Sequence, residues 1–413
     1  MSDESSVLLT IDRDRFHADF DALAGFGATE DGGVDRPAFS PNHQAARRWF
    51  AERAEGAGLV VEVDGASNHS AVLAVPGAEK TLVIGSHLDS VPSGGQFDGA
   101  FGVMAALEVL RTVKEAGVQL SVNLMAIDFT DEESHYMEFL GSRAFTGVLS
   151  LAELQTPHAA RLRDAIAGLG MDLEAMANCG RDPNEFAGYL ELHIEQGPRL
   201  VDTATDIGIV DSIIGLRFHR LVFTGRADHA GTTPMEIRRN AGLGAAAFTM
   251  ALHELLDAEF TDCVGNVGSM VLESGVTNVV SKEAVVDFEF RFPDENRGDE
   301  LEAQIRDRAR SIADRYDLEF EFIPTGRARS AQMDQALQRT AGEAAERLGL
   351  SAVSMNSGAG HDAQIMSVFT PACVIFIPSV GGISHNPAEF STREDCENGA
   401  NVLLHTVLAG FGR

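Results

Sequence analysis

The arrangement of short apolar runs along the chain constrains the fold most strongly. Runs of strand length, such as Leu59–Val63, Leu82–Ile84 and Leu120–Ile127, are separated by helical segments such as Val103–Glu115. Strands that alternate with helices form parallel or mixed sheets, so this pattern predicts an α/β domain. With 413 residues, the chain is long enough for more than one domain.

The pattern changes near residue 213 and returns near residue 331. Between these points, Leu216–Phe223 and Ala284–Phe292 partly alternate apolar and polar residues, which is typical of half-buried antiparallel strands. Helical stretches are expected at Ala241–Glu259 and Glu300–Tyr316, and after residue 331 a helix at Gln332–Leu348 precedes an apolar strand at Cys373–Ile377. The sequence therefore predicts one α/β domain from residues 1–212 and 331–413, interrupted by an inserted α+β domain at 213–330.

Charge and composition exclude several classes of partner. The chain has 32 Lys and Arg against 62 Asp and Glu, a net charge of −30. Such a chain repels nucleic-acid phosphates and anionic membrane surfaces, so neither is an expected partner. No apolar run approaches the length of a membrane span, and the first residues do not resemble a signal peptide. The four cysteines are scattered, which favours free thiols and a cytoplasmic protein.

Histidines and carboxylates gather directly after the apolar runs. The clusters are Gly85–Ser90 with the nearby Asp98, Asp131–Glu133, Glu191–Pro198, and Gly381–Glu389. A single histidine or acidic pair in such a turn is more often structural than functional. Four clusters at strand ends together indicate a metal site, because open α/β sheets place ligands there. In the first cluster, Asp89 is expected to hold the second ring nitrogen of His87.

Six stretches carry a resemblance to a known family. They read GSHLDSVPSGGQFDGAFGV, DFTDEES with FLGSRAFTG, LELHIEQGPRL, GRADHAGTTPM, SGAGHDAQIM and GGISHNPAEFS, and they span residues 85 to 391 in order. The chain resembles the dinuclear-metal amidohydrolases that include N-carbamoyl-L-amino-acid hydrolases, allantoate amidohydrolases and β-ureidopropionases. These belong to the wider clan of aminoacylases and carboxypeptidase-G-like metallopeptidases. The resemblance implies a three-layer α/β/α catalytic domain of the zinc-aminopeptidase type with an inserted ferredoxin-like lid and dimerisation domain.

The resemblance also implies a role for each residue of the metal site. His87 and His193 would bind one ion, Glu133 and His385 the other, Asp98 would bridge the two ions, and Glu132 would be the general base. Imidazole and carboxylate ligands suit Zn²⁺, which we expect, and also Mn²⁺, Co²⁺ or Ni²⁺.

Substrate-binding residues follow from the same resemblance. Gln196 would contact the ureido or amide group, Arg291 the substrate carboxylate, and Gly358, Ala359 and Gly360 would offer backbone donors. His229 and Asn278 would reach the metal centre of a partner subunit, giving a homodimer with shared active sites. His361 and Asp362 are expected to be structural.

The implied reaction is hydrolysis of a linear C–N bond in an N-carbamoyl-L-amino acid or related ureido acid. Hydroxide held by the two ions would attack, and Glu132 would move the proton. Allantoate is the close alternative substrate, followed by N-acyl amino acids and dipeptides. A non-catalytic binding protein is a further alternative, against which the retained Glu132 argues. The family commonly has Arg-Phe shortly after the Glu pair, where this chain has Ser134-His135-Tyr136. This departure leaves the choice of substrate open.

Overall fold

The computed structural model describes residues 8–273 and 275–413. Contacts divide the chain into two compact units, each of which is described by itself. The larger unit holds the residues up to Asp211 together with Gln332–Arg413, and the smaller unit holds Ser212–Ala331.

A mixed sheet, with nine strands among the described residues, forms the centre of the larger unit. Its order is β1 (Val60–Val63), β2 (His69–Leu73), β4 (Asn123–Phe129), β3 (Thr81–His87), β5 (Phe186–Ile194), β13 (Ala372–Ile377), β6 (Ile207–Ile213) and β11 (Ala331–Gln332), and β12 (Ala352–Ser357) pairs with β6. Strand β3 is parallel to both β4 and β5, and β5 is parallel to β13. The carboxyl ends of these four strands therefore meet at one edge of the sheet.

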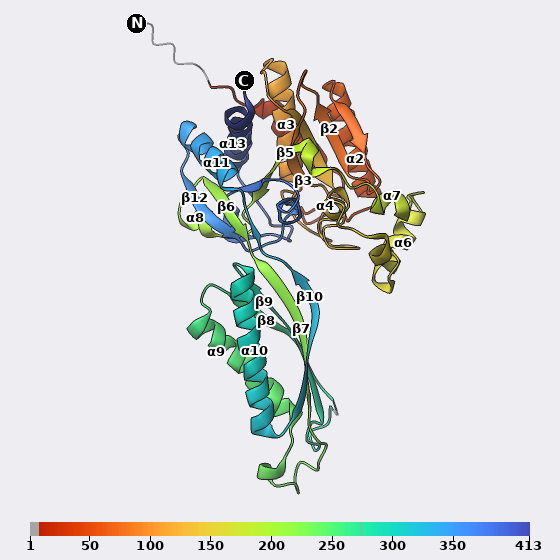
Figure 1. The fold of residues 1–413 in the computed structure, drawn as a ribbon, viewed down its shortest axis with the longest axis vertical. Coiled ribbons are helices and arrows are strands. Elements are labelled where there is room, and N and C mark those ends of the chain that lie inside the picture. The colour runs from red at the N-terminus through yellow and green to blue at the C-terminus, as the bar shows by residue number, and fades with distance from the viewer. Residues whose placement is uncertain (1–7, 274) are drawn as a thin grey trace. The chain divides into compact units, whose positions relative to one another are not determined.

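Helices surround the sheet of the larger unit, and several of them pack directly on its strands (Figure 1). They are α1 (Arg13–Ala24), α2 (Pro41–Gly56), α3 (Ala100–Glu115), α4 (Leu140–Phe145), α5 (Leu151–Leu154), α6 (Ala160–Ala167), α7 (Leu173–Ala177), α8 (Arg199–Asp202), α11 (Gln335–Arg347), α12 (Asp362–Met366) and α13 (Arg393–Phe411). Helix α3 packs on β3, β4 and β5 and is buried along most of its length, while α13 packs on α3 and β13. The predicted α/β class is confirmed. Within the described residues, no helix is both long and apolar enough to cross a membrane.

The smaller unit is an antiparallel sheet with two long helices on one face (Figure 1). The strand order is β10 (Glu319–Ala328), β7 (Gly215–Thr224), β9 (Glu283–Phe292) and β8 (Val264–Leu272), with helices α9 (Ala241–Glu259) and α10 (Glu295–Tyr316). Alternate residues of β9, including Phe288, Phe290 and Phe292, are buried in the core with α9 and α10. Strand β8 forms one edge of this sheet and leaves Val264 and Val271 more than half exposed.

Several element boundaries differ from the sequence prediction. Helix α10 begins at Glu295 rather than Glu300, because the Asp294 side chain accepts a hydrogen bond from the Arg297 N–H and caps the helix five residues earlier. Helix α3 begins at Ala100, three residues before the predicted start, and β4 is Asn123–Phe129 rather than Leu120–Ile127. The later end of β4 brings the strand to within two residues of Asp131.

Candidate metal centre

Four strand ends bring the predicted ligands together at one edge of the larger unit's sheet. His87 is the last residue of β3, and Glu132 and Glu133 follow β4 by a few residues. His193 lies near the end of β5, and His385 is in the loop between β13 and α13. This edge is the crevice in which open α/β sheets bind ligands.

The first group of side chains is His87, Asp98 and His193, all buried. Asp98 Oδ1 lies 3.0 Å from His193 Nε2 and 3.7 Å from His87 Nε2. Gly99 permits this approach, because it has φ +62° and a Cβ there would lie 2.3 Å from the His87 ring. Ligand atoms of the three side chains are all within 4.8 Å of one another, which is the spacing a single metal ion would need.

The other ring nitrogen of each buried histidine is held by a backbone carbonyl. His87 Nδ1 lies 2.9 Å from the Asp89 carbonyl, and His193 Nδ1 lies 2.8 Å from the Ile194 carbonyl. If each Nδ1 carries the proton, Nε2 is left with a lone pair for a cation.

Asp89 therefore holds the second ring nitrogen of His87 as expected, but with its backbone carbonyl and not with its carboxylate. This carboxylate instead accepts backbone N–H groups from Asp131, Glu132 and Glu133, at 3.0, 3.4 and 3.3 Å. It fixes the turn that carries the two glutamates. Burial raises the pKa of Asp89 to about 6, while Arg47 and these amides act in the opposite direction.

The second group is Asp98, Glu133 and His385, whose ligand atoms are also within 4.8 Å of one another. His385 Nε2 is 3.2 Å from Asp98 Oδ2 and 3.5 Å from Glu133 Oε2. The His385 side chain is 52% exposed, so this group is open to solvent on one side. Asp98 belongs to both groups and presents Oδ1 to His87 and His193 and Oδ2 to His385, as a bridging ligand would.

Glu132 lies beside both groups. Its Oε2 is 3.6 Å from His87 Nε2, and it forms a third group of close ligand atoms with His87 and Glu133. Burial and the neighbouring Glu133 carboxylate raise the pKa of Glu132 well above its usual range. A carboxyl group in this position, beside both groups of ligand atoms, can accept a proton and return it.

The residues of the centre fit divalent cations. Burial and the Asp98 carboxylate raise the pKa of Glu133 well above its usual range, and its buried Oε1 has no hydrogen-bond partner among the described residues. Burial would lower the pKa of His193, but the hydrogen bond with Asp98 outweighs it and raises the pKa to about 9. Cations placed among these groups would compensate the crowded carboxylates and give Glu133 Oε1 a partner.

The predicted substrate residues of the larger unit are partly engaged within the chain. Gln196 Nε2 donates to Asp98 Oδ2 at 2.8 Å, while its buried Oε1 has no hydrogen-bond partner among the described residues. The Ala359 N–H donates to Ser357 Oγ at 3.2 Å, and Gly358 is exposed. His361 bonds Ser357 Oγ and packs its ring 4.5 Å from that of His193.

Two residues that received no role in the sequence prediction join this network. Ser384 Oγ is 3.2 Å from Asp98 Oδ2, and Glu389 accepts the backbone N–H groups of Phe97 and Asp98. Both lie in the Gly381–Glu389 stretch. Their position around the histidine at 385 was the only signal in the sequence.

The remaining predicted residues belong to the smaller unit. His229 is exposed, and its Nδ1 accepts the N–H groups of Gly231 and Thr232, which leaves Nε2 as a donor toward solvent. The Asn278 carbonyl accepts the Ala230 N–H at 3.0 Å, so His229 and Asn278 lie on adjoining loops.

Arg291 lies at the opposite end of the same sheet. It pairs with Leu216 in the β7–β9 ladder, whereas His229 and Asn278 lie beyond the Thr224–Glu283 pair. Glu283 and Arg291 are eight steps apart along β9, which is about 26 Å at the rise of a strand. The Arg291 Nε donates to Glu289 Oε1 at 3.1 Å.

Comparisons with known proteins agree with this arrangement. Residues 83–409 match the model of Peptidase family M20/M25/M40. The chain therefore belongs to this family of metal-dependent hydrolases.

Individual relatives narrow the class to amidohydrolases. The chain is 34% identical to an N-carbamoyl-L-amino acid amidohydrolase of Geobacillus stearothermophilus, covering 93% of this chain and 95% of the relative. It is 31% identical to an allantoate amidohydrolase of Bacillus subtilis, covering 92% and 93%. A solved hydantoinase/carbamoylase family amidase from Burkholderia ambifaria matches with a TM-score of 0.87 at 32% identity, covering 98% of this chain and 100% of that one. The predicted resemblance is confirmed.

Proposed function

We propose that this chain hydrolyses the linear C–N bond of an N-carbamoyl-L-amino acid. The main support for this proposal is that two groups of candidate ligand side chains share Asp98 and that Glu132 lies beside them. Such an arrangement would suit two cations and a proton-transfer group around one reacting carbonyl. The amidohydrolase relatives support a ureido acid as the substrate class.

His87 and His193 would hold one ion, Glu133 and His385 the other, and Asp98 would bridge them. Zn²⁺ is the proposed ion, and Mn²⁺, Co²⁺ or Ni²⁺ would suit the same nitrogen and oxygen ligands. When bound, two such ions polarise a carbonyl and lower the pKa of water near them. The distances of 3.0 Å from Asp98 Oδ1 to His193 Nε2 and 3.2 Å from Asp98 Oδ2 to His385 Nε2 support Asp98 as the shared ligand.

Glu132 would take the proton from the attacking water and return it to the leaving nitrogen. Its carboxylate is buried beside both groups of ligand atoms, and burial and Glu133 raise its pKa, which favours acceptance of a proton. The leaving nitrogen departs as the amino group of the amino acid. The remaining carbamate then decomposes to carbon dioxide and ammonia.

Gln196 and the backbone of Gly358 and Ala359 would orient the ureido group, and Arg291 would bind the carboxylate. Gln196 fits this role because its Oε1 has no partner among the described residues and can accept a ureido N–H. A guanidinium binds a carboxylate through two parallel hydrogen bonds. Substrate would compete with Glu289 for Arg291.

His229 and Asn278 would act on the active site of a partner subunit in a homodimer. A small ureido acid cannot span the roughly 26 Å between these residues and Arg291, so both ends of one sheet cannot serve the same substrate molecule. A C2 dimer allows Arg291 of one subunit and His229 of the other to serve the same site.

A substrate panel tests the proposed activity. N-carbamoyl-L-amino acids, allantoate, N-acetyl-L-amino acids and dipeptides would be assayed in parallel with Zn²⁺, Mn²⁺, Co²⁺ or Ni²⁺. We expect the highest kcat/KM for an N-carbamoyl-L-amino acid. A preference for allantoate would assign the alternative ureido substrate, and no turnover of any compound would favour a binding protein.

Subunit mixing tests the shared site. Two inactive variants, Glu132→Gln and His229→Ala, would be combined under conditions that exchange subunits. If His229 acts across the dimer, each mixed dimer has one intact site and activity returns. Continued inactivity of demonstrated mixed dimers would place His229 in the site of its own subunit.

We also propose that this enzyme is located in the cytoplasm. All four cysteines lie in the described part of the chain and are free, and three of them are buried. Unpaired thiols agree with a reducing compartment.

A further inference from the structure

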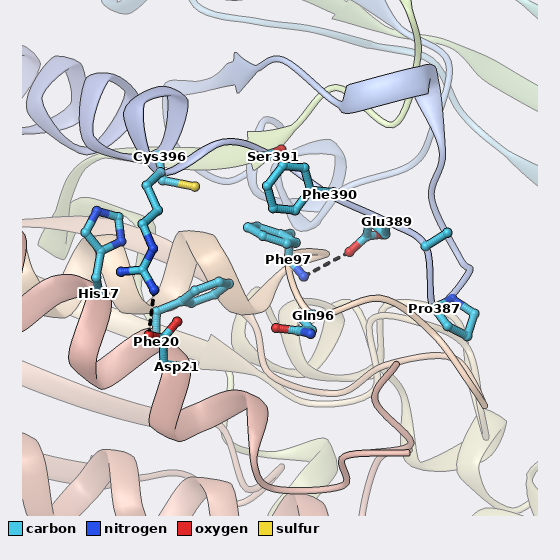
Figure 2. A pocket seen from close by; sticks show the side chains of 12 residues that line it. His17, Phe20, Asp21, Gln96, Phe97, Pro387, Glu389, Phe390, Ser391 and Cys396 are labelled. Carbon is cyan, nitrogen blue, oxygen red and sulfur yellow. Dashed lines mark hydrogen bonds and ion pairs between the residues drawn. The ribbon is translucent and has the colours of Figure 1, made fainter. Parts of the chain in front are cut away.

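The carboxylate of Glu389 faces the turn that leads into Asp98. Its Oε1 accepts the Phe97 N–H at 2.9 Å and the Asp98 N–H at 3.0 Å. Figure 2 shows this carboxylate directed at the Phe97 backbone from the wall of a pocket that Phe97 and Phe390 also line. Glu389 is only 5% exposed, so these two bonds are largely shielded from water.

The second oxygen of Glu389 reaches the Asp98 side chain through Ser384. Ser384 Oγ lies 2.8 Å from Glu389 Oε2 and 3.2 Å from Asp98 Oδ2. A hydroxyl has one proton, and the shorter distance favours donation to Glu389. Gln196 Nε2 then donates to both Ser384 Oγ and Asp98 Oδ2, at 3.2 and 2.8 Å. Glu389 therefore bonds the backbone of Asp98 directly and orders the donors around its side chain.

Gly95 makes room for this carboxylate. A Cβ at position 95 would lie 2.0 Å from Glu389 Oε1 and 2.2 Å from its Cδ. Any side chain there would displace Glu389 from the two amides. The two hydrogen bonds of Glu389 therefore depend on glycine at position 95, although the two residues are 294 positions apart in the chain.

We propose that Glu389 is a positioning residue that sets the orientation of the Asp98 carboxylate toward the His87–His193 pair and toward His385. Asp98 presents Oδ1 to His193 and Oδ2 to His385, so a rotation of this carboxylate changes both contacts at once. Hydrogen bonds behind a metal ligand commonly contribute about 10–100-fold to metal affinity. The inference rests on the proposed role of Asp98 as the shared ligand.

Zinc affinity, measured without substrate, tests this role. The full-length protein and its variants would compete with a chromophoric chelator for Zn²⁺. We expect Glu389→Ala to weaken zinc binding about 10–100-fold and Gly95→Ala to weaken it in the same direction. Glu389→Gln should lie between them and wild type, because its amide oxygen still accepts both N–H groups. The exposed Glu394→Gln, in the first turn of α13, is the matched control and should bind like wild type.

Two results would overturn the role of Glu389. One is zinc affinity within twofold of wild type for Glu389→Ala, or for Gly95→Ala if Glu389→Ala does not fold. The other is a lower melting temperature of the metal-free variants with unchanged zinc affinity, which indicates a purely structural role. Absence of zinc binding by the wild type would instead overturn the proposed function, and this inference with it.

Discussion

Glu132 and Glu133 are adjacent in the chain but face different surroundings. Glu133 lies 3.5 Å from the exposed His385, whereas Glu132 lies near the buried His87. Both glutamates have pKa values raised well above the usual range, and burial is the largest cause for each of them. The proposed roles, with Glu133 as a ligand and Glu132 as the base, come from the family resemblance, and this difference in neighbours agrees with them.

Replacement of Glu132 by Gln should separate metal binding from proton transfer. The amide has nearly the same shape but cannot accept the proton, so kcat should fall by about 10²–10⁴-fold with both metals retained. Metal content and kcat would be measured on the same preparation. A fully loaded variant with near-wild-type kcat would remove Glu132 from the proton-transfer role.

Arg291→Ala should act mainly on substrate binding. Without the guanidinium, the KM for an N-carbamoyl-L-amino acid should rise by about 10-fold or more, because a charged hydrogen bond contributes about 1.5–3 kcal/mol. The matched substrate is the N-carbamoyl-L-amino-acid amide, in which a neutral amide replaces the carboxylate. Its KM should change little. An equal rise of KM for both compounds would contradict a carboxylate contact.

At the scale of elements, a buried ion pair fixes the end of β4 beside the end of β3. Arg47 of α2 donates to Asp128 Oδ2 at 2.6 Å, and Asp128 Oδ1 accepts the Leu88 N–H at 2.7 Å. Asp128 is fully buried and Arg47 nearly so. The pair therefore joins the residue after His87 to the strand that leads to Glu132.

Removal of this arginine should destabilise the larger unit. Arg47→Met leaves the Asp128 carboxylate buried without its cation, which costs about 3–5 kcal/mol. The free energy of unfolding would be measured by urea denaturation of the metal-free protein. Arg48→Met, one residue away and exposed, is the control and should change it little. Equal stability of the two variants would contradict a structural role for the pair.

The sequence predicted elements where periodicity and burial coincide. Helix α9 was predicted at its observed bounds, and β9 alternates regularly between buried and half-buried residues. Strand β10 was not predicted by its residues, because it contains Pro324 and Gly326 and most of its side chains are exposed. Hydrophobic periodicity is weak in such an edge strand.

The candidate site was predicted to the level of residues but not of atoms. The four clusters at strand ends are local in sequence, so their positions could be inferred from the apolar runs. Which atom of Asp89 holds His87 could not be inferred, because a backbone carbonyl and a carboxylate can both accept a hydrogen bond. The Asp131 N–H that bonds the carboxylate is 42 residues away in the chain. The role of Glu389 could not be predicted for the same reason, because the backbone N–H groups that it accepts are 291 and 292 residues away in the chain.

At the scale of the whole molecule, the exposed edge of the smaller unit's sheet is the expected dimer contact. Strand β8 presents Val264, Val271 and Leu272, exposed by 60%, 59% and 45%, and the adjoining α9 exposes Met250 by 61%. An unpaired apolar edge strand is a template for pairing with a second chain.

Val271→Lys should dissociate this dimer and remove activity with it. A charge on the edge strand opposes pairing, and a monomer would lack the His229 of a partner. Sedimentation velocity and kcat would be followed together, with Val368→Lys in the larger unit, 81% exposed, as control. A fully active monomer would contradict the shared site, and an unchanged dimer would place the contact elsewhere.

Metal dependence of the reaction tests most sharply whether the Asp98-centred site is a two-ion hydrolytic centre. The protein would be freed of metal by a chelator, dialysed and titrated with Zn²⁺ or Mn²⁺, while amino-acid release from an N-carbamoyl-L-amino acid is recorded. We expect no release without metal, recovery that saturates at about two ions per chain, and no recovery for Asp98→Ala. Full activity of the metal-free protein, or of Asp98→Ala, would contradict the account.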